Sequence, residues 1–125
     1  MQQAVRKYLM ALEAGDADKA AALFTPDGWV ESPFLGRVPV REYIAKVAGA
    51  SSRAKLTVHD VLVSAEGHLR AVGYYLYDWW LKDGSHVSFE CADVFNFDLN
   101  TGRIASIVLV YDTHLVRGVV EKKYP

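Results

Sequence analysis

The sequence has a single cysteine, Cys91, among its 125 residues, and it has neither a long apolar run nor an excess of one charge. One thiol excludes an internal disulfide and is typical of a reducing compartment. No stretch approaches the roughly 18 consecutive apolar residues of a membrane span, and residues 1–7 lack the apolar core of a secretory signal. The 14 basic and 15 acidic side chains nearly balance, which disfavours nucleic acid or an anionic membrane as a partner. We therefore expect a cytoplasmic protein with neither of these partners.

Nucleotide-binding and serine-hydrolase motifs are missing as well. The sequence contains no GxGxxG, no GxxxxGK[ST] and no GxSxG pattern. Its four histidines are not spaced three or four residues apart, and none stands with the cysteine in a metal-ligand pattern. We therefore expect neither a metal site nor a cofactor.

The periodicity of apolar residues changes once along the chain. Helical spacing predicts helices over residues 3–14, 17–24 and 40–48, with a short strand at 29–32. Four later runs, rich in β-branched and aromatic residues and separated by turn sequences, predict long strands: 56–64, 69–81, 86–97 and 103–115. No repeat or linker divides the chain, and its 51% apolar content suffices for one core. The sequence predicts one α+β domain, residues 1–125, with three helices packed on an antiparallel sheet.

The turn sequence Asp83-Gly84 determines the expected faces of this sheet. If these two residues form the whole hairpin loop, Trp80 pairs with Val87 and Asp78 pairs with Phe89. The inner face, covered by the helices, is then expected to hold Tyr74, Leu76, Asp78, Trp80, Phe89, Cys91, Asp93, Phe95, Ile107, Leu109 and Tyr111. The outer face is expected to carry three aromatic residues: Tyr75, Tyr77 and Trp79. Interfaces favour such residues, so we expect a homodimer through this face; the alternative is cover by side chains of the same subunit.

Two acidic residues, Asp78 and Asp93, fall on the expected inner face. A buried carboxylate costs several kcal/mol unless it is paired or protonated, and burial raises its pKa toward neutrality. Roughly 13 Å of strand would separate the two carboxyl groups, which is too far for them to share a proton. The alternatives are a different register, or acids that tie down loops or helix ends. Tyr8, on the apolar stripe of the first helix, is either a hydrogen-bond donor to the same cavity or plain core.

Several segments of the chain resemble one family. Residues 6–16 (RKYLMALEAGD), 22–24 (ALF) and 29–33 (WVESP) resemble the opening of the ketosteroid isomerases, and 93–97 (DVFNF) continues the match. These enzymes belong to the nuclear transport factor 2-like superfamily, together with the SnoaL-like polyketide cyclases, to which residues 111–117 (YDTHLVR) are more similar. The resemblance covers nearly the whole chain. It implies a cone-shaped α+β barrel, in which helices close a strongly bent sheet around an apolar pocket, and usually a dimer.

The resemblance also implies roles for single residues. In the ketosteroid isomerases a helix tyrosine and a protonated strand aspartate form an oxyanion hole, and these positions match Tyr8 and Asp93. The family's general base, an aspartate before a proline, is replaced by Ser32, whose hydroxyl cannot take a proton from carbon near pH 7. A second family tyrosine matches Ile44, with Tyr43 as its neighbour. SnoaL-like cyclases need only the strand aspartate, whereas limonene epoxide hydrolases need an interior arginine that this pattern lacks.

We therefore expect an isomerase- or cyclase-type acid/base enzyme that acts, without a cofactor, on a hydrophobic carbonyl compound such as a steroid, polyketide or terpenoid. Asp93 is the expected acid, Tyr8 its companion donor and Asp78 a candidate base. The expected ligand-binding residues are Ser32, Phe34, Tyr43, Trp80, Phe89, Phe95 and Tyr111. Two alternatives stay open at this point: a non-catalytic binding domain for an apolar small molecule, and a dimeric interaction module whose pocket has no function.

Overall fold

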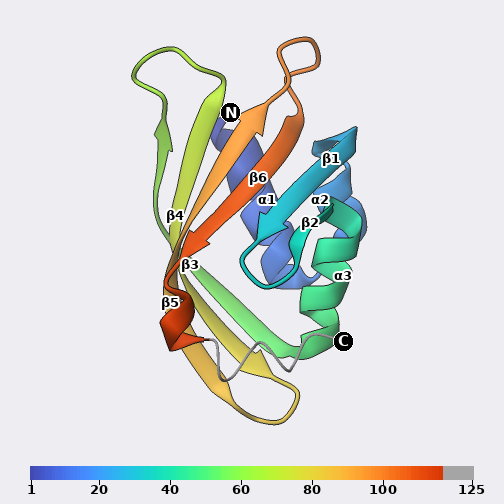
Figure 1. The fold of residues 1–125 in the computed structure, drawn as a ribbon, viewed down its shortest axis with the longest axis vertical. Coiled ribbons are helices and arrows are strands. Elements are labelled where there is room, and N and C mark those ends of the chain that lie inside the picture. The colour runs from blue at the N-terminus through green and yellow to red at the C-terminus, as the bar shows by residue number, and fades with distance from the viewer. Residues whose placement is uncertain (117–125) are drawn as a thin grey trace.

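Three helices pack on one side of a curved sheet in the computed structural model, which describes residues 1–116 (Figure 1). The helices are α1 (Gln2–Ala14), α2 (Ala17–Ala21) and α3 (Val40–Ala50). The predicted α+β class, with helices on one face of the sheet, is confirmed. Residues 117–125 of the expected domain lie outside the described part of the chain.

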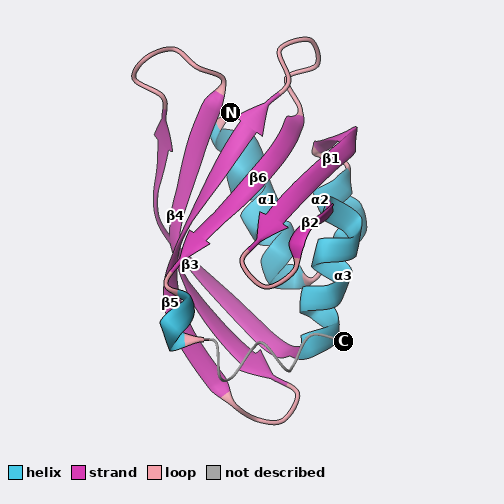
Figure 2. Ribbon diagram, in the orientation of Figure 1, coloured by secondary structure: helices cyan, strands magenta, loops and turns pink. Residues whose placement is uncertain are grey.

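The described residues form a six-stranded sheet in the order β2-β1-β6-β5-β4-β3 (Figure 2). Its strands are β1 (Phe24–Ser32), β2 (Gly36–Pro39), β3 (Ser51–Val63), β4 (Arg70–Leu81), β5 (His86–Phe97) and β6 (Ile104–Tyr111), and the short helix η1 (Thr113–Leu115) follows. Neighbouring strands are antiparallel except β1 and β6, which run parallel. The sheet is therefore mixed: the four long strands are antiparallel as expected, and the parallel pairing of β1 with β6 was not foreseen.

Helix α1 carries its apolar stripe, with Tyr8 near the middle, against the sheet. It ends as predicted at Gly15, whose φ of 68° is readily adopted by glycine, and the Asp16 carboxylate accepts a hydrogen bond from Lys19 N at 3.0 Å to begin α2. Gly73 on β4 lies under α1, since a Cβ there would meet Val5 Cγ1 at 3.0 Å. The missing side chain lets α1 approach the sheet closely.

The expected helix 17–24 and turn 25–28 differ from the structure. Helix α2 already ends at Ala21, and Phe24 begins β1 opposite Ile104 of β6. The next pair is Trp29 with Ser106. The four residues 25–28 of β1 therefore lie opposite residue 105 of β6 alone. The turn-forming residues 25–28 therefore make an irregularity within the strand.

The hairpin between β4 and β5 has a different register from the expected one. Leu81 N donates to Ser85 O at 2.9 Å, which leaves a loop of residues 82–84, with Gly84 at a φ of 88°. In three-residue loops of this kind the last residue adopts the left-handed backbone conformation and is usually glycine. The loop is thus one residue longer than Asp83-Gly84 alone, and Trp80 pairs with His86. A one-residue shift moves every side chain of β4 to the opposite face of the sheet.

With the corrected register, the β4 residues expected on the inner face lie on the outer face, and those expected outside lie inside. Tyr75, Tyr77 and Trp79 are buried on the inner face, so they are not the outer surface through which a dimer was expected. Asp78 and Trp80 lie on the outer face. In the β5–β6 hairpin the shift is two residues: Asp93 lies opposite Leu109, where Ile107 was expected. A shift of two preserves the faces, so Asp93 stays inside as predicted.

Candidate functional site

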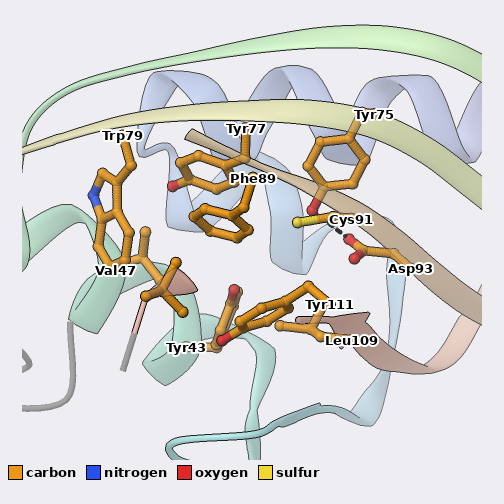
Figure 3. A pocket seen from close by; sticks show the side chains of 11 residues that line it. Tyr43, Val47, Tyr75, Tyr77, Trp79, Phe89, Cys91, Asp93, Leu109 and Tyr111 are labelled. Carbon is orange, nitrogen blue, oxygen red and sulfur yellow. Dashed lines mark hydrogen bonds between the residues drawn. The ribbon is translucent and has the colours of Figure 1, made fainter. Parts of the chain in front are cut away.

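A small cavity lies between α3 and the inner faces of β4, β5 and β6 (Figure 3). Its volume is about 20 Å³, which is room for about one water molecule. The lining is mostly aromatic and aliphatic and consists of Tyr43, Val47, Tyr75, Tyr77, Trp79, Phe89, Cys91, Asp93, Leu109, Tyr111 and Val116. Asp93 is the one carboxylate in this lining, and no histidine, lysine or arginine of the described chain belongs to it.

The Asp93 carboxyl group is fully buried, with 0% of the residue exposed. Burial raises its pKa to about 7, and a hydrogen bond from Tyr75 acts in the opposite direction. The Tyr75 hydroxyl donates to Asp93 Oδ2 at 2.9 Å, whereas Asp93 Oδ1 has no hydrogen-bond partner in residues 1–116. The two oxygens of one carboxyl group are therefore in different environments.

Tyr8 is fully buried beside this carboxyl group. Its ring packs edge-on against Phe24 and Phe95, with centroids 5.9 and 5.5 Å away. Burial, and then the charge of Asp93, raise the pKa of the Tyr8 phenol well above its ordinary value, so the hydroxyl stays protonated. That hydroxyl has no hydrogen-bond partner within the described chain. Tyr8 is therefore a hydrogen-bond donor that residues 1–116 leave unused.

Aromatic rings fill most of the space beyond Asp93. Tyr77 and Phe89 stack with centroids 5.4 Å apart and planes 7° from parallel, and Trp79 lies 5.7 Å from Tyr77. Tyr111 packs on Phe89 at 5.0 Å and on Phe34 at 6.3 Å. Tyr77, Trp79, Phe89 and Tyr111 thus form an aromatic wall of the cavity that Asp93 also lines.

Comparison with known families agrees with this architecture. The model of the SnoaL-like domain matches residues 5–107. The chain belongs to the SnoaL-like domain family. The family resemblance predicted from the sequence is thereby confirmed, as is the nuclear transport factor 2-like fold. No curated protein matches the chain.

Solved structures similar to this SnoaL-like domain share its fold at low sequence identity. A hypothetical protein from Catenulispora acidiphila, with a ketosteroid isomerase-like fold and in complex with trimethylamine, has a TM-score of 0.79 at 13% identity, covering 98% of this chain and 97% of that one. TsrD from Streptomyces laurentii has a TM-score of 0.75 at 20% identity, with 96% and 94% covered. A limonene epoxide hydrolase-like enzyme from M. tuberculosis has a TM-score of 0.72 at 20% identity, with 94% and 90% covered.

The structure brings together part of the predicted site. Asp93, Tyr43, Phe89 and Tyr111 line the cavity of this SnoaL-like domain. Tyr8 and Phe95 are buried next to each other in the core behind it. Their predicted roles in binding and catalysis stay predictions.

Ser32 and Phe34 lie outside the cavity lining. Ser32 is buried at the end of β1, where its Oγ accepts a hydrogen bond from Phe34 N at 3.4 Å. Phe34 is half-buried and reaches the site through its contact with Tyr111. Ser32, the position that the resemblance matches to the general base of the ketosteroid isomerases, therefore makes a structural contact in this chain.

The interior placement of Asp78 and Trp80 is wrong. Asp78 Oδ1 lies 3.1 Å from His86 Nε2 on the outer face. Trp80 stacks on His86 with centroids 4.3 Å apart, and Arg53 lies over its ring at 4.7 Å. Asp78 therefore cannot be a base in the cavity, because the sheet separates the two.

Sequence reasoning missed Val47 and Val116 of the cavity lining, as well as every cavity-lining residue of β4: Tyr75, Tyr77 and Trp79. Their strand held a usable signal. The alternate residues of β4 that include them carry no charge, whereas the opposite set includes Arg70 and Asp78. Placing the uncharged set inside would have identified the correct face.

Proposed function

We propose that this SnoaL-like domain is an acid/base enzyme that moves a proton on a small, apolar carbonyl compound, with Asp93 as the group that carries the proton. The supporting observation is a single buried carboxyl group in an apolar cavity, with a pKa of about 7. Near neutral pH its acid and base forms have comparable populations, which is the condition under which general acid–base catalysis is most effective.

The proposed cycle needs only residues of this chain. In its ionised form Asp93 takes a proton from the carbon next to the carbonyl, and the electron pair of the broken C–H bond moves to the carbonyl oxygen. The resulting enolate oxygen accepts a hydrogen bond from the companion donor expected from the sequence, the Tyr8 hydroxyl. Tyr8 lies outside the cavity lining, but its hydroxyl is protonated, buried beside Asp93 and without a partner in residues 1–116, so a ligand that enlarges the cavity toward it gains this donor. Where the enolate is conjugated with a C=C bond, Asp93 then returns its proton to the far carbon of that dienolate. Alternatively, the enolate carbon attacks a second carbonyl of the same molecule, and Asp93 gives its proton to the alkoxide that this attack forms. These two outcomes are the isomerase and cyclase reactions.

The size of the cavity constrains the ligand. About 20 Å³ admits one water molecule but no carbonyl compound with the lining as it stands. A substrate therefore enters by displacing rings of the aromatic wall, and Tyr111 is only half-buried. This favours a compound with one or two small rings over a full steroid.

The proposed function is tested by proton exchange without knowledge of the natural substrate. Small cyclic ketones are incubated with the protein in heavy water, and loss of the proton signal next to the carbonyl is followed by NMR. We expect catalysed exchange whose rate rises with pH through about 7, because only the ionised form of Asp93 accepts a proton. Exchange no faster than with the same concentration of acetate contradicts the proposal.

A non-catalytic binding domain is the alternative, favoured by the lack of a second carboxyl or a histidine in the described lining. A phenol, which mimics the enolate, separates the two functions when its binding is followed by tryptophan fluorescence, since Trp79 lines the cavity. Phenol binding without ketone exchange supports the binding domain. Neither binding nor exchange supports the interaction module.

We further infer a homodimer through the corrected outer face. Apolar side chains from three adjacent strands form this patch: Val72, Tyr74, Leu76, Val94, Val108 and Val110. Tyr74 and Val110 are 41% and 52% exposed, an arrangement common at subunit interfaces.

The variant Val110→Glu tests this dimer, because it places a charge at the most exposed residue of the patch. We expect the dissociation constant measured by light scattering to rise at least about tenfold. Leu99→Glu is the matched control, since Leu99 is 81% exposed in a loop away from the patch. A wild-type chain that is monomeric at all concentrations, or an unchanged Val110→Glu dimer, excludes this interface.

A further inference from the structure

The hydrogen bond from Tyr75 to Asp93 connects two neighbouring strands diagonally. The direct partner of Tyr75 on β5 is Cys91, and the direct partner of Asp93 on β4 is Gly73. Tyr75 therefore reaches two pairs along the ladder, to the next residue on the same face of β5, and Figure 3 shows its hydroxyl directed at the carboxyl group. Gly73 has no side chain that could take this place beside Asp93. The contact is thus specific to Tyr75 among the residues of β4.

The two carboxyl oxygens differ because of this contact. Oδ2 accepts the Tyr75 hydroxyl at 2.9 Å, and Oδ1 is buried without a partner in residues 1–116. Burial, and then the charge of Asp93, raise the pKa of the Tyr75 phenol well above its ordinary value, so it remains a donor. An occupied oxygen is a poor site for proton exchange, whereas an unpartnered one is available to a ligand.

We propose that Tyr75 is the positioning residue of this site: it holds Asp93 through Oδ2 and thereby leaves Oδ1 as the oxygen that exchanges a proton with the ligand. The inference rests on the proposed function of Asp93 and adds a residue that the sequence placed on the opposite face. Tyr75 does not itself transfer the proton; it acts through the orientation and ionisation of Asp93.

Among residues 1–116, the Tyr75 hydroxyl is the one group that donates a hydrogen bond to Asp93 in the structure. The titratable groups facing it are phenols and a thiol: Tyr8 from α1, Tyr43 from α3, Tyr77 from β4, Cys91 from β5 and Tyr111 from β6. None is cationic, and burial raises the pKa of the Cys91 thiol well above its ordinary value, so it stays neutral as expected. The Tyr75 hydrogen bond is accordingly the contact that lowers the pKa of Asp93 against the effect of burial.

The variant Tyr75→Phe removes the hydroxyl and keeps the ring. We expect the pKa of Asp93, followed by carbon-13 NMR of its carboxyl carbon, to rise by about one to two, the usual effect of one hydrogen bond to a charged group. The pH midpoint of ketone exchange should rise by the same amount. Above that midpoint the rate should stay below wild type, because both oxygens are then free to rotate.

Tyr77→Phe is the matched control, since it removes a phenol hydroxyl from the same face of the same strand but leaves the Tyr75–Asp93 hydrogen bond in place. It should leave the Asp93 titration close to wild type. If Tyr75→Phe does not fold, 3-fluorotyrosine incorporated at position 75 keeps the contact and makes the phenol a stronger donor. The pKa of Asp93 should then fall.

The outcomes separate this inference from the proposed function. An Asp93 titration that is the same in wild type and in Tyr75→Phe, or unchanged by 3-fluorotyrosine, overturns the role of Tyr75 whatever the activity. A shifted titration in a protein that exchanges no ketone proton overturns the proposed function, and with it the role of Oδ1, while control of Asp93 ionisation by Tyr75 stands.

Discussion

The variant Asp93→Asn is expected to lose about 10²–10⁴-fold of the ketone exchange rate while it keeps its fold, because an amide cannot carry the proton. The substitution preserves the shape of the side chain, and the amide oxygen can still accept the Tyr75 hydroxyl. Since Asp93 is the one carboxylate in the described cavity lining, no neighbouring acid is placed to replace it. The loss should appear in kcat more than in KM, since the transferred proton is involved only in the transition state.

Asp78→Asn is the matched control for this measurement. It makes the same chemical change in a neighbouring strand, but Asp78 lies on the outer face against His86. Its exchange rate should equal that of wild type. Equal losses in the two variants, or no loss in Asp93→Asn, would show that the cavity carboxyl does not carry the reaction. Circular dichroism of each variant checks that the fold is intact.

The variant Asp93→Asn is also expected to be more stable than wild type at pH 8. The pKa of Asp93 is about 7 in the folded chain against an ordinary value of 3.8, so the folded state binds a proton more tightly than the unfolded state. Its contribution to stability is complete below pH 4 and is lost as pH rises through 7. About three pKa units correspond to on the order of 4 kcal/mol. The neutral amide of Asp93→Asn avoids this loss.

Urea unfolding at several pH values measures the effect. The free energy of unfolding of Asp93→Asn minus that of wild type should increase by on the order of 4 kcal/mol between pH 4 and pH 8. Asp78→Asn removes an exposed pair, and its difference from wild type should stay within about 1 kcal/mol. If the free energies of unfolding of Asp93→Asn and wild type change in the same way with pH, the buried carboxyl group has the same pKa in the folded and unfolded states. A site residue whose removal stabilises the fold is one retained for chemistry.

Local features of the sequence predicted all three helices, although α2 ends three residues earlier than expected. Gly15 and Asp16 mark the end of α1 and the beginning of α2, because a left-handed cap and a side-chain cap depend only on adjacent residues. The interior position of Asp93 was also predictable, since its strand alternates cleanly between buried and less buried residues. The bulge in β1 was not, because residues 25–28 form a turn sequence that the parallel pairing with β6 draws into a strand.

The sequence by itself determined the family, the α+β class, the buried Asp93 and the position of Tyr8, all of which depend on local motifs and on alternation within one segment. Only the tertiary structure decided which face of β4 meets the helices. Both faces of that strand carry aromatic residues, so aromatic content does not choose between them and only the lack of charge favours the inner one; a loop longer by one residue fixes the choice. That choice brings Tyr75 to Asp93 and removes Asp78 from the cavity. The volume of the cavity was likewise decided by packing, since it depends on how rings from four elements fit together.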